Sequence, residues 1–166
     1  MTPDITAFDL SLTSAGVASK HGTARIVPKG KGIDRLREIR SGVTAAVLAT
    51  KPELIVIEGY ANGMGDNYAK GMGGGVARLA IADCGIPIVE VSPTTLKKFA
   101  TGKGNANKDD MLEAAIRHFG FQGHGNDEAD AWLLLKMAEA AYGDGGANAK
   151  QREAIASVTW PSLSAE

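Results

Sequence analysis

The segment 54–58 reads Leu-Ile-Val-Ile-Glu, an uninterrupted apolar run that ends in a carboxylate and stands between Lys51-Pro52 and Gly59. A surface strand would alternate apolar with polar side chains, so a continuous run of this length predicts a strand buried on both faces. Such a strand needs a layer of helices on each side. The segment therefore favours an α/β domain built on a central sheet.

The rest of the chain supplies elements that fit this plan. Short apolar runs predict strands at 5–10, 16–19, 24–27 and 87–91. Apolar residues spaced by three and four predict a helix at 34–48, and further helices are expected at 76–83, from 92 to a break at 102–104, at 108–119 and at 126–141. Strands first, then helices alternating with strands, predict one five-stranded mixed sheet flanked by helices on both faces.

Two segments are weakly specified. Seven of the 17 residues from 59 to 75 are glycine, which predicts a loop that orders only against a ligand. No clear pattern follows Tyr142. We therefore expect one domain over residues 1–145, with 146–166 as its C-terminal segment or as a tail.

Composition limits the expected cellular compartment and the way in which the protein could bind DNA. The single cysteine, Cys84, allows no internal disulfide and is expected to be a small buried side chain in a reducing cytoplasm. The N-terminus has no secretion signal and no run is long enough to cross a membrane, so we expect a cytoplasmic protein without a membrane partner. A net charge of −1 means that any binding of DNA must come from local patches.

Acidic residues stand where soluble proteins usually avoid them. Asp9 lies inside the first apolar strand, and Glu58 ends the central one. Asp127 and Asp130 open the most apolar helix, and a spacing of three puts both on nearly the same helix face. Each acid also has an ordinary explanation: a turn cap for Asp9, a solvated strand end for Glu58 or a favourable helix start for Asp127. Taken together, however, the four acids predict a cluster of carboxylates at one place in the fold.

Carboxylates that are forced together repel each other unless a cation lies between them, and Mg²⁺ prefers such oxygen ligands. Two Mg²⁺ ions would activate a water and stabilise the leaving oxygen of a phosphodiester. The cluster therefore indicates hydrolysis of nucleic acid.

Four segments carry a resemblance to a known family. They are residues 8–18 (FDLSLTSAGVA), 56–60 (VIEGY), 93–108 (PTTLKKFATGKGNANK) and 126–131 (NDEADA). In this order they resemble the motifs of the RuvC family of Holliday junction resolvases, over residues from about 6 to 140.

The resemblance implies an RNase H-like fold of the retroviral integrase superfamily and a homodimer that makes paired nicks in branched DNA. It implies a Mg²⁺ site, open to Mn²⁺ as well, formed by Asp9, Glu58, Asp127 and Asp130. It also implies that Lys97 and Lys108 stand near the scissile phosphate, where a positive charge stabilises the transition state.

Further residues are candidate DNA contacts. Tyr60 is placed to stack on an unpaired base or to be an ordinary loop aromatic. Four basic residues are further candidates for contacts with DNA, although they could equally form an ordinary solvated surface: Lys70, Arg78, Lys98 and Lys103. His124 is close to Asp127 in sequence, but we interpret it as a surface turn residue.

The sequence also departs from the family pattern. The turn after Asp9 lacks the usual Pro-Gly, the charge is nearly neutral and the loop after Glu58 is unusually glycine-rich. These departures suggest a phage or mobile-element enzyme that acts in a bacterial or phage-infected cell, and that also cuts forks, flaps or Y-shaped DNA. Two other hypotheses are a non-catalytic junction-binding protein and an ATPase of the actin and sugar-kinase superfamily, whose fold needs two such domains.

Overall fold

The computed structural model describes residues 2–11, 13–59, 68–143 and 146–163, with the backbone alone for 68–70. The strands are β1 (Ile5–Leu10), β2 (Ala15–Ser19), β3 (Gly22–Ile26), β4 (Leu54–Glu58) and β5 (Ile88–Val91). The helices are α1 (Gly32–Thr50), α2 (Tyr68–Ala82), α3 (Pro93–Thr101), α4 (Lys108–Phe119), α5 (Asn126–Tyr142) and α6 (Ala149–Ala156).

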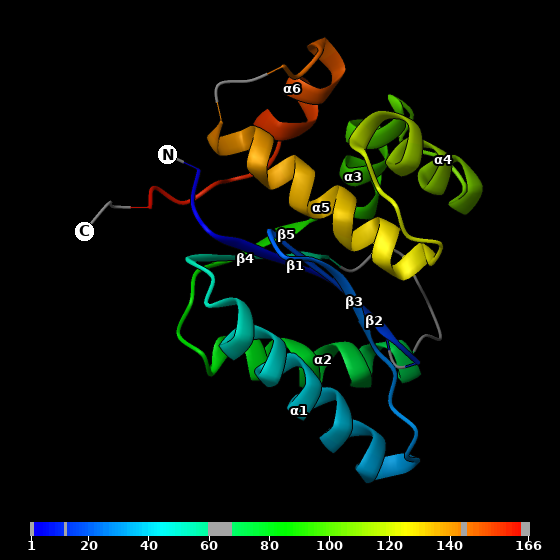
Figure 1. Cartoon of the computed structure of the whole chain (residues 1–166), viewed down its shortest axis with the longest axis vertical. Helices are drawn as coiled ribbons and strands as arrows, with labels where there is room; N and C mark the ends of the chain where they lie inside the picture. Colours follow the sequence, from blue (N-terminus) through cyan, green and yellow to red (C-terminus); the bar gives the residue numbers. More distant parts are fainter. Residues whose placement is uncertain (1, 12, 60–67, 144–145, 164–166) are drawn as a thin grey trace.

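The strands form one mixed sheet in the order β3-β2-β1-β4-β5. The β1–β2–β3 meander is antiparallel, whereas β4 and β5 run parallel to β1. Helices α1 and α2 cover one face, and α3, α4, α5 and α6 lie on the other (Figure 1). The predicted five-stranded mixed sheet with helices on both faces is confirmed.

Strand β4 is buried on both faces, as its apolar run predicted. Leu54 and Val56 belong to the core beneath α5, while Ile55 and Ile57 belong to the core beneath α1 and α2. Successive side chains of a strand point to opposite faces, so the same alternation decides on which side each functional residue of β1 and β4 lies.

The structure corrects several predicted boundaries. Helix α2 begins at Tyr68, so the glycines near 71–75 lie in a helix and not in the predicted loop. Gly73 and Gly74 are buried there, and burial against the rest of the fold offsets the poor helix propensity of glycine. Strand β3 lies two residues earlier than predicted at its start, and α1 is longer at both ends.

The C-terminal segment contains a helix that the sequence did not predict. Helix α6 begins with a capping box, in which Asn148 and Gln151 each accept a hydrogen bond from the other's backbone N–H. Ala154 joins the core beneath α5, and the hydroxyl of Tyr142 donates to the carbonyl of Pro161 at 2.8 Å. This segment is therefore packed on the α5 side of the domain.

None of the helices, over the residues that the structure describes, is long and apolar enough to span a membrane.

Candidate active site

Asp9 and Glu58 come together at the ends of two neighbouring strands. The parallel register of β1 and β4 pairs Phe8 with Ile57, so the next residue on each strand is one of the two acids. Asp9 shares its face with Ala7, and Glu58 shares its face with Val56; both apolar residues belong to the core beneath α5. The two carboxylates therefore face the layer that contains α5.

The first turn of α5 brings Asp127 and Asp130 to the same place. Gly16, which pairs with Asp9 across β1 and β2, lies directly under this turn. A Cβ atom on Gly16 would overlap the backbone carbonyl of Asp127, so only a glycine allows so close an approach. The helix start is thereby held beside the strand that carries Asp9.

The Asp127 carboxylate is held by the meander. The hydroxyl of Ser14 donates a short hydrogen bond to its Oδ2, and the guanidinium of Arg25 lies 3.6 Å from the same oxygen. Next to it, the hydroxyl of Thr23 donates to Glu128 at 3.3 Å. These polar contacts attach the α5 N-terminus to β2 and β3. Neither contact was predicted: Ser14 lies within the motif 8–18 but had no role of its own there, and Arg25 lies in a strand without a motif.

Burial and neighbouring carboxylates raise the pKa of two of the acids. Burial first, and then the charges of Glu58, Asp130 and Asp127, raise the pKa of the Asp9 carboxyl from its ordinary 3.8 to about 8. Burial, and then the charge of Asp127, raises the pKa of Asp130 to about 6. Four acids that the sequence spreads over 122 positions thus form one electrostatic unit.

Two lysines oppose this negative charge. Lys108 lowers the pKa of both Asp9 and Asp130, and Lys97 lowers that of Asp130. Lys97 is in the middle of α3, and Lys108 is the first residue of α4. The six residues expected to be catalytic are therefore within electrostatic reach of one another, although their roles stay predictions.

The donor set suits a hard divalent cation. It offers carboxylate oxygens, and its mutual repulsion is what such a cation relieves. Among the residues that the structure describes, however, no three Asp, Glu, His or Cys side chains converge as the ligands of one metal ion do. Asp127 is directed to Ser14 and Arg25 instead. The arrangement fits a metal in chemistry and charge, and binding would draw the carboxylates together.

Arg78 lies behind the site. Its Nη2 donates to the carbonyl oxygen of Glu58 at 2.6 Å, and its Nε lies 3.5 Å from the carboxylate of Glu90. The side chain of Arg78 is only 17% exposed, and its contacts hold the end of β4 in place. A contact with DNA remains a prediction for this residue.

The other predicted residues lie elsewhere. Tyr60 and the side chain of Lys70 fall outside the described residues. Lys98 and Lys103 line a separate cavity between α3, α4 and α6. His124 is exposed, as expected for a surface turn. Cys84 is only partly buried, which corrects the expectation of a buried side chain, and its thiol donates to the carbonyl of Ala80.

A family model, curated relatives and solved structures were compared with this chain. A family model described as crossover junction endodeoxyribonuclease RuvC matches residues 13–134. The match begins just after Asp9 and includes Glu58, Asp127 and Asp130.

Curated relatives carry the same description. One from Myxococcus xanthus is 34% identical over 101 residues, which cover 60% of this chain and 52% of the relative. One from Anaeromyxobacter sp. (strain K) is 32% identical over 130 residues, which cover 72% of this chain and 70% of the relative. The chain thus spans about half the length of the first relative and 70% of the second.

Among solved structures, Thermus thermophilus RuvC in complex with a Holliday junction substrate matches with a TM-score of 0.67 at 18% identity. The match covers 84% of this chain and 93% of that one. At this identity the likeness establishes the shared RNase H-like fold.

Proposed function

Because the chain belongs to the RuvC family of crossover junction endodeoxyribonucleases, we propose that it is a structure-selective endonuclease that nicks Holliday junctions. The single observation that carries the proposal is the convergence of four carboxylates at the junction of β1, β4 and α5, where the charges of Glu58, Asp130 and Asp127 add to burial in raising the pKa of Asp9. Relatives named for this activity, and a structural neighbour bound to a Holliday junction, support the choice of substrate.

We assign Asp9, Glu58, Asp127 and Asp130 to a site for Mg²⁺, or for Mn²⁺ in its place, with two ions per site. The chemistry that such ions supply is activation of the attacking water and stabilisation of the leaving oxygen. The burial and repulsion that raise the pKa of Asp9 and Asp130 support this assignment, because a divalent cation would remove the cost of keeping both carboxylates charged.

The two lysines of the site have a different task. Lys97 and Lys108 are close enough to the acids to shift their pKa values, and both are cationic groups on helices that face the site. We assign them to the scissile phosphate, where their charge stabilises the extra negative charge of the transition state. Arg78 and the Ser14–Arg25 pair hold the backbone of Glu58 and the carboxylate of Asp127 in place.

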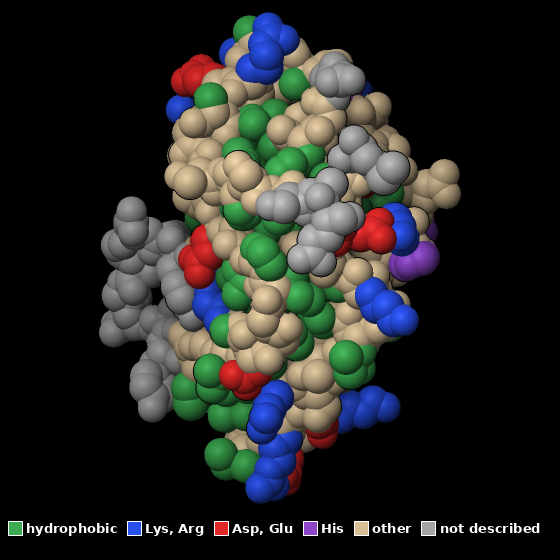
Figure 2. All heavy atoms as spheres, turned by 90° about the vertical axis from the view of Figure 1, so that its left-hand side faces the viewer, with side chains coloured by type: hydrophobic (Ala, Val, Ile, Leu, Met, Phe, Trp, Pro, Cys, Tyr) green, Lys and Arg blue, Asp and Glu red, His purple; other side chains and the backbone are tan. Residues whose placement is uncertain are grey.

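We also propose a homodimer, since paired nicks in a four-way junction need two active sites. Large apolar side chains reach the surface on the α1–α2 side of the sheet, and they support an interface there: Ile33, Leu48, Met72 and Leu79, at 61%, 67%, 41% and 63% exposure. Ile33 and Met72 line one groove of about 520 Å³ between the two helices. In Figure 2, hydrophobic side chains reach the surface in the lower part of the molecule, which is this layer.

The test is incubation with Mg²⁺ and a panel of labelled four-way junctions, forks, flaps and linear duplex. We expect symmetrical nicks in the four-way junction, no cleavage of the duplex and none of any substrate in EDTA. Asp130→Asn should bind the junction and not cut it, while Asp83→Asn, an exposed acid outside the site, should cut normally.

Other outcomes separate the alternatives. If forks, flaps and four-way junctions were cut equally well, the protein would be a broader branched-DNA nuclease and not a junction-selective resolvase. Tight binding of the junction without any cut, with Mg²⁺ or with Mn²⁺, would support the non-catalytic junction-binding protein.

A further inference from the structure

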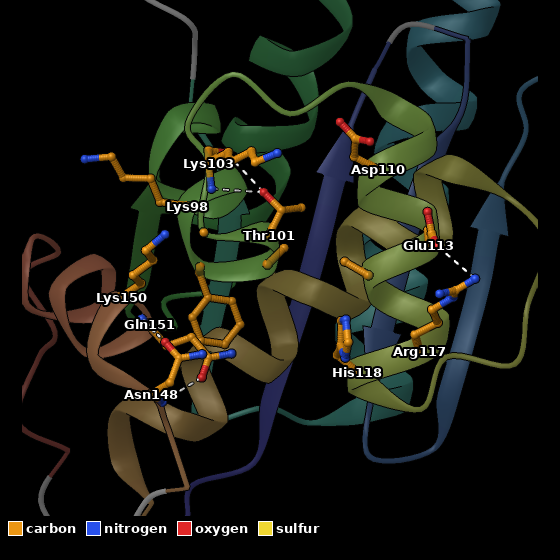
Figure 3. A pocket seen from close by; sticks show the side chains of 14 residues that line it. Lys98, Thr101, Lys103, Asp110, Glu113, Arg117, His118, Asn148, Lys150 and Gln151 are labelled. Atoms are coloured by element: carbon orange, nitrogen blue, oxygen red, sulfur yellow. Dashed lines mark hydrogen bonds and ion pairs between the residues drawn. The ribbon is translucent and has the colours of Figure 1, made fainter.

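A cavity of about 490 Å³ opens between α3, α4 and α6, away from the acidic site. Phe99, Ala100 and Ala114 form its apolar floor, and polar or charged side chains form its walls. Figure 3 shows Lys98, Lys103 and Lys150 on one wall and the α4 side chains Glu113, Arg117 and His118 on the other. One helix of the cavity, α6, lies beyond the residues that the family model matches.

The charges of the cavity are unequal. Its two acids already have partners: Asp110 accepts the backbone N–H of Asn107 at 3.0 Å, and Glu113 pairs with Arg117 at 3.0 Å. Over the described part of the chain, no carboxylate pairs with Lys98, Lys103 or Lys150. One wall therefore presents three lysines without an ion-pair partner among the described residues, and His118 on the facing wall adds a hydrogen-bonding group.

Lys150 is fixed in position at this wall. Gly102 ends α3 with a φ of 77°, and its missing side chain leaves room for Lys150. The Cδ and Nζ atoms of Lys150 lie 3.1 Å and 3.4 Å from the place where a Cβ on Gly102 would stand. The stem of Lys150 thus lies against the end of α3.

Helix α3 connects this wall with the active site. Lys97 acts on Asp130, and Lys98, the next residue on the helix, lines the cavity. Helix α3 therefore carries two adjacent positive charges, one near the acidic site and one at the cavity.

We propose that this cavity binds the phosphate backbone of one arm of the branched DNA substrate, and that α6 contributes Lys150 to this contact. The inference rests on the proposed function and extends it to a surface outside the matched family region. Phosphate contacts of this kind set the position of the duplex and carry no sequence information. The apolar floor accommodates the sugar edges between phosphates, while the lysine wall supplies the counter-charge.

The test measures the dissociation constant of a fluorescent four-way junction in EDTA over a range of salt concentrations, with the full chain. Lys150→Ala should raise the dissociation constant about 3- to 10-fold at low salt and make the log–log salt slope shallower by about 1, because one phosphate contact is lost. Lys150→Glu should have a larger effect, and Lys150→Arg should restore binding.

Lys29→Ala is the matched control, because it removes the same charge from an exposed lysine that does not line the cavity, and it should leave the affinity and the salt slope unchanged. Unchanged affinity and slope in Lys150→Ala and Lys150→Glu, with a wild type that binds and cuts, would overturn this inference alone. If the Lys150 variants lost binding of inorganic phosphate but kept the wild-type affinity for the junction, the cavity would be a site for small anions and this inference would also be overturned. A wild type that binds no junction would overturn the proposed function as well.

Discussion

Asp9 is the residue on which the proposed chemistry depends most. It sits at the end of a buried strand with three carboxylates around it, and its pKa of about 8 measures how costly its charge is without a cation. In an unfolded chain the same carboxyl would titrate near its ordinary 3.8. Folding therefore favours the protonated form, and this group contributes less and less stability as the pH rises between these values.

We accordingly expect Asp9→Asn to raise the thermal unfolding temperature of the metal-free protein, by more at pH 8 than at pH 5. A few degrees are expected, since about 1 kcal/mol shifts the midpoint of a domain of this size by about 2–4 °C. Differential scanning calorimetry in EDTA measures this. Mg²⁺ should then stabilise the wild type more than the variant.

Asp83→Asn, an exposed acid at the end of α2, is the control and should follow the wild type at every pH. A difference between Asp9→Asn and the wild type that stays constant from pH 5 to pH 8 would contradict the electrostatic account of the site.

Variants of the neighbouring residues Lys97 and Lys98 should distinguish an effect on the cleavage step from an effect on DNA binding. Lys97 is partly buried and acts on Asp130, whereas Lys98 is exposed and lines the α3–α4–α6 cavity. Lys97→Ala should lower the single-turnover rate at saturating protein by about 10²-fold with little change in junction affinity. Lys98→Ala should weaken binding and keep the rate. Quench-flow cleavage and anisotropy titration distinguish them, and identical profiles would reject the assigned roles.

At the scale of elements, the site depends on how closely α5 approaches β2. Gly16 allows this contact because it has no side chain, and polar contacts of Ser14, Thr23 and Arg25 hold the first turn of the helix in place. The helix start carries Asp127 and Asp130, so a small displacement would move two acids relative to the two on the strands.

Gly16→Ala is therefore expected to cost about 1–3 kcal/mol of unfolding free energy and to reduce cleavage by about 10²-fold or more. Gly75→Ala is its control. Gly75 is exposed within α2, and among the described residues no atom outside its own stretch of helix lies within 4 Å of an added Cβ, so alanine should stabilise that helix by up to about 1 kcal/mol. Chemical denaturation and cleavage assays test both. Full activity in Gly16→Ala would show that α5 tolerates a shift.

The same elements show what a sequence can and cannot predict. The run 54–58 predicted β4 because burial on both faces leaves a simple pattern, and Asp9 and Glu58 stood out as charges within apolar strands. The start of helix α2 was predicted too late in the sequence, because glycine has a low intrinsic helix propensity. Burial against the rest of the fold stabilises the helix there. Arg25 could not be identified, since its contact with Asp127 joins residues about 100 positions apart.

At the scale of the molecule, the two sides of the sheet have different tasks. One side carries the acids and the α3–α4–α6 cavity, and the other exposes the apolar residues of α1 and α2. A dimer through α1 and α2 would leave both active sites accessible to DNA. The predicted phage origin remains a prediction, since the relatives described above are bacterial.

Leu79→Glu should convert such a dimer into a monomer, because Leu79 is 63% exposed on α2 and a carboxylate would be buried in the interface. Ile116→Glu is the matched control: Ile116 is 48% exposed, but it lies on α4, on the opposite side of the sheet. Analytical ultracentrifugation gives the mass of each variant. A dimer that survives Leu79→Glu and dissociates with Ile116→Glu would move the interface to the other face.

Helix α5 has buried side chains from Ala129 to Ala138, and it packs across β1 and β2. We expect the backbone amides of this buried stretch to exchange with solvent only when the whole domain opens, whereas those of the first turn, which carries Asp127, exchange by local fraying. Asp130 belongs to the buried stretch, so its position depends on the stability of the whole domain. Deuterium uptake along α5 would report on the survival of the catalytic arrangement and of the entire fold in a single measurement.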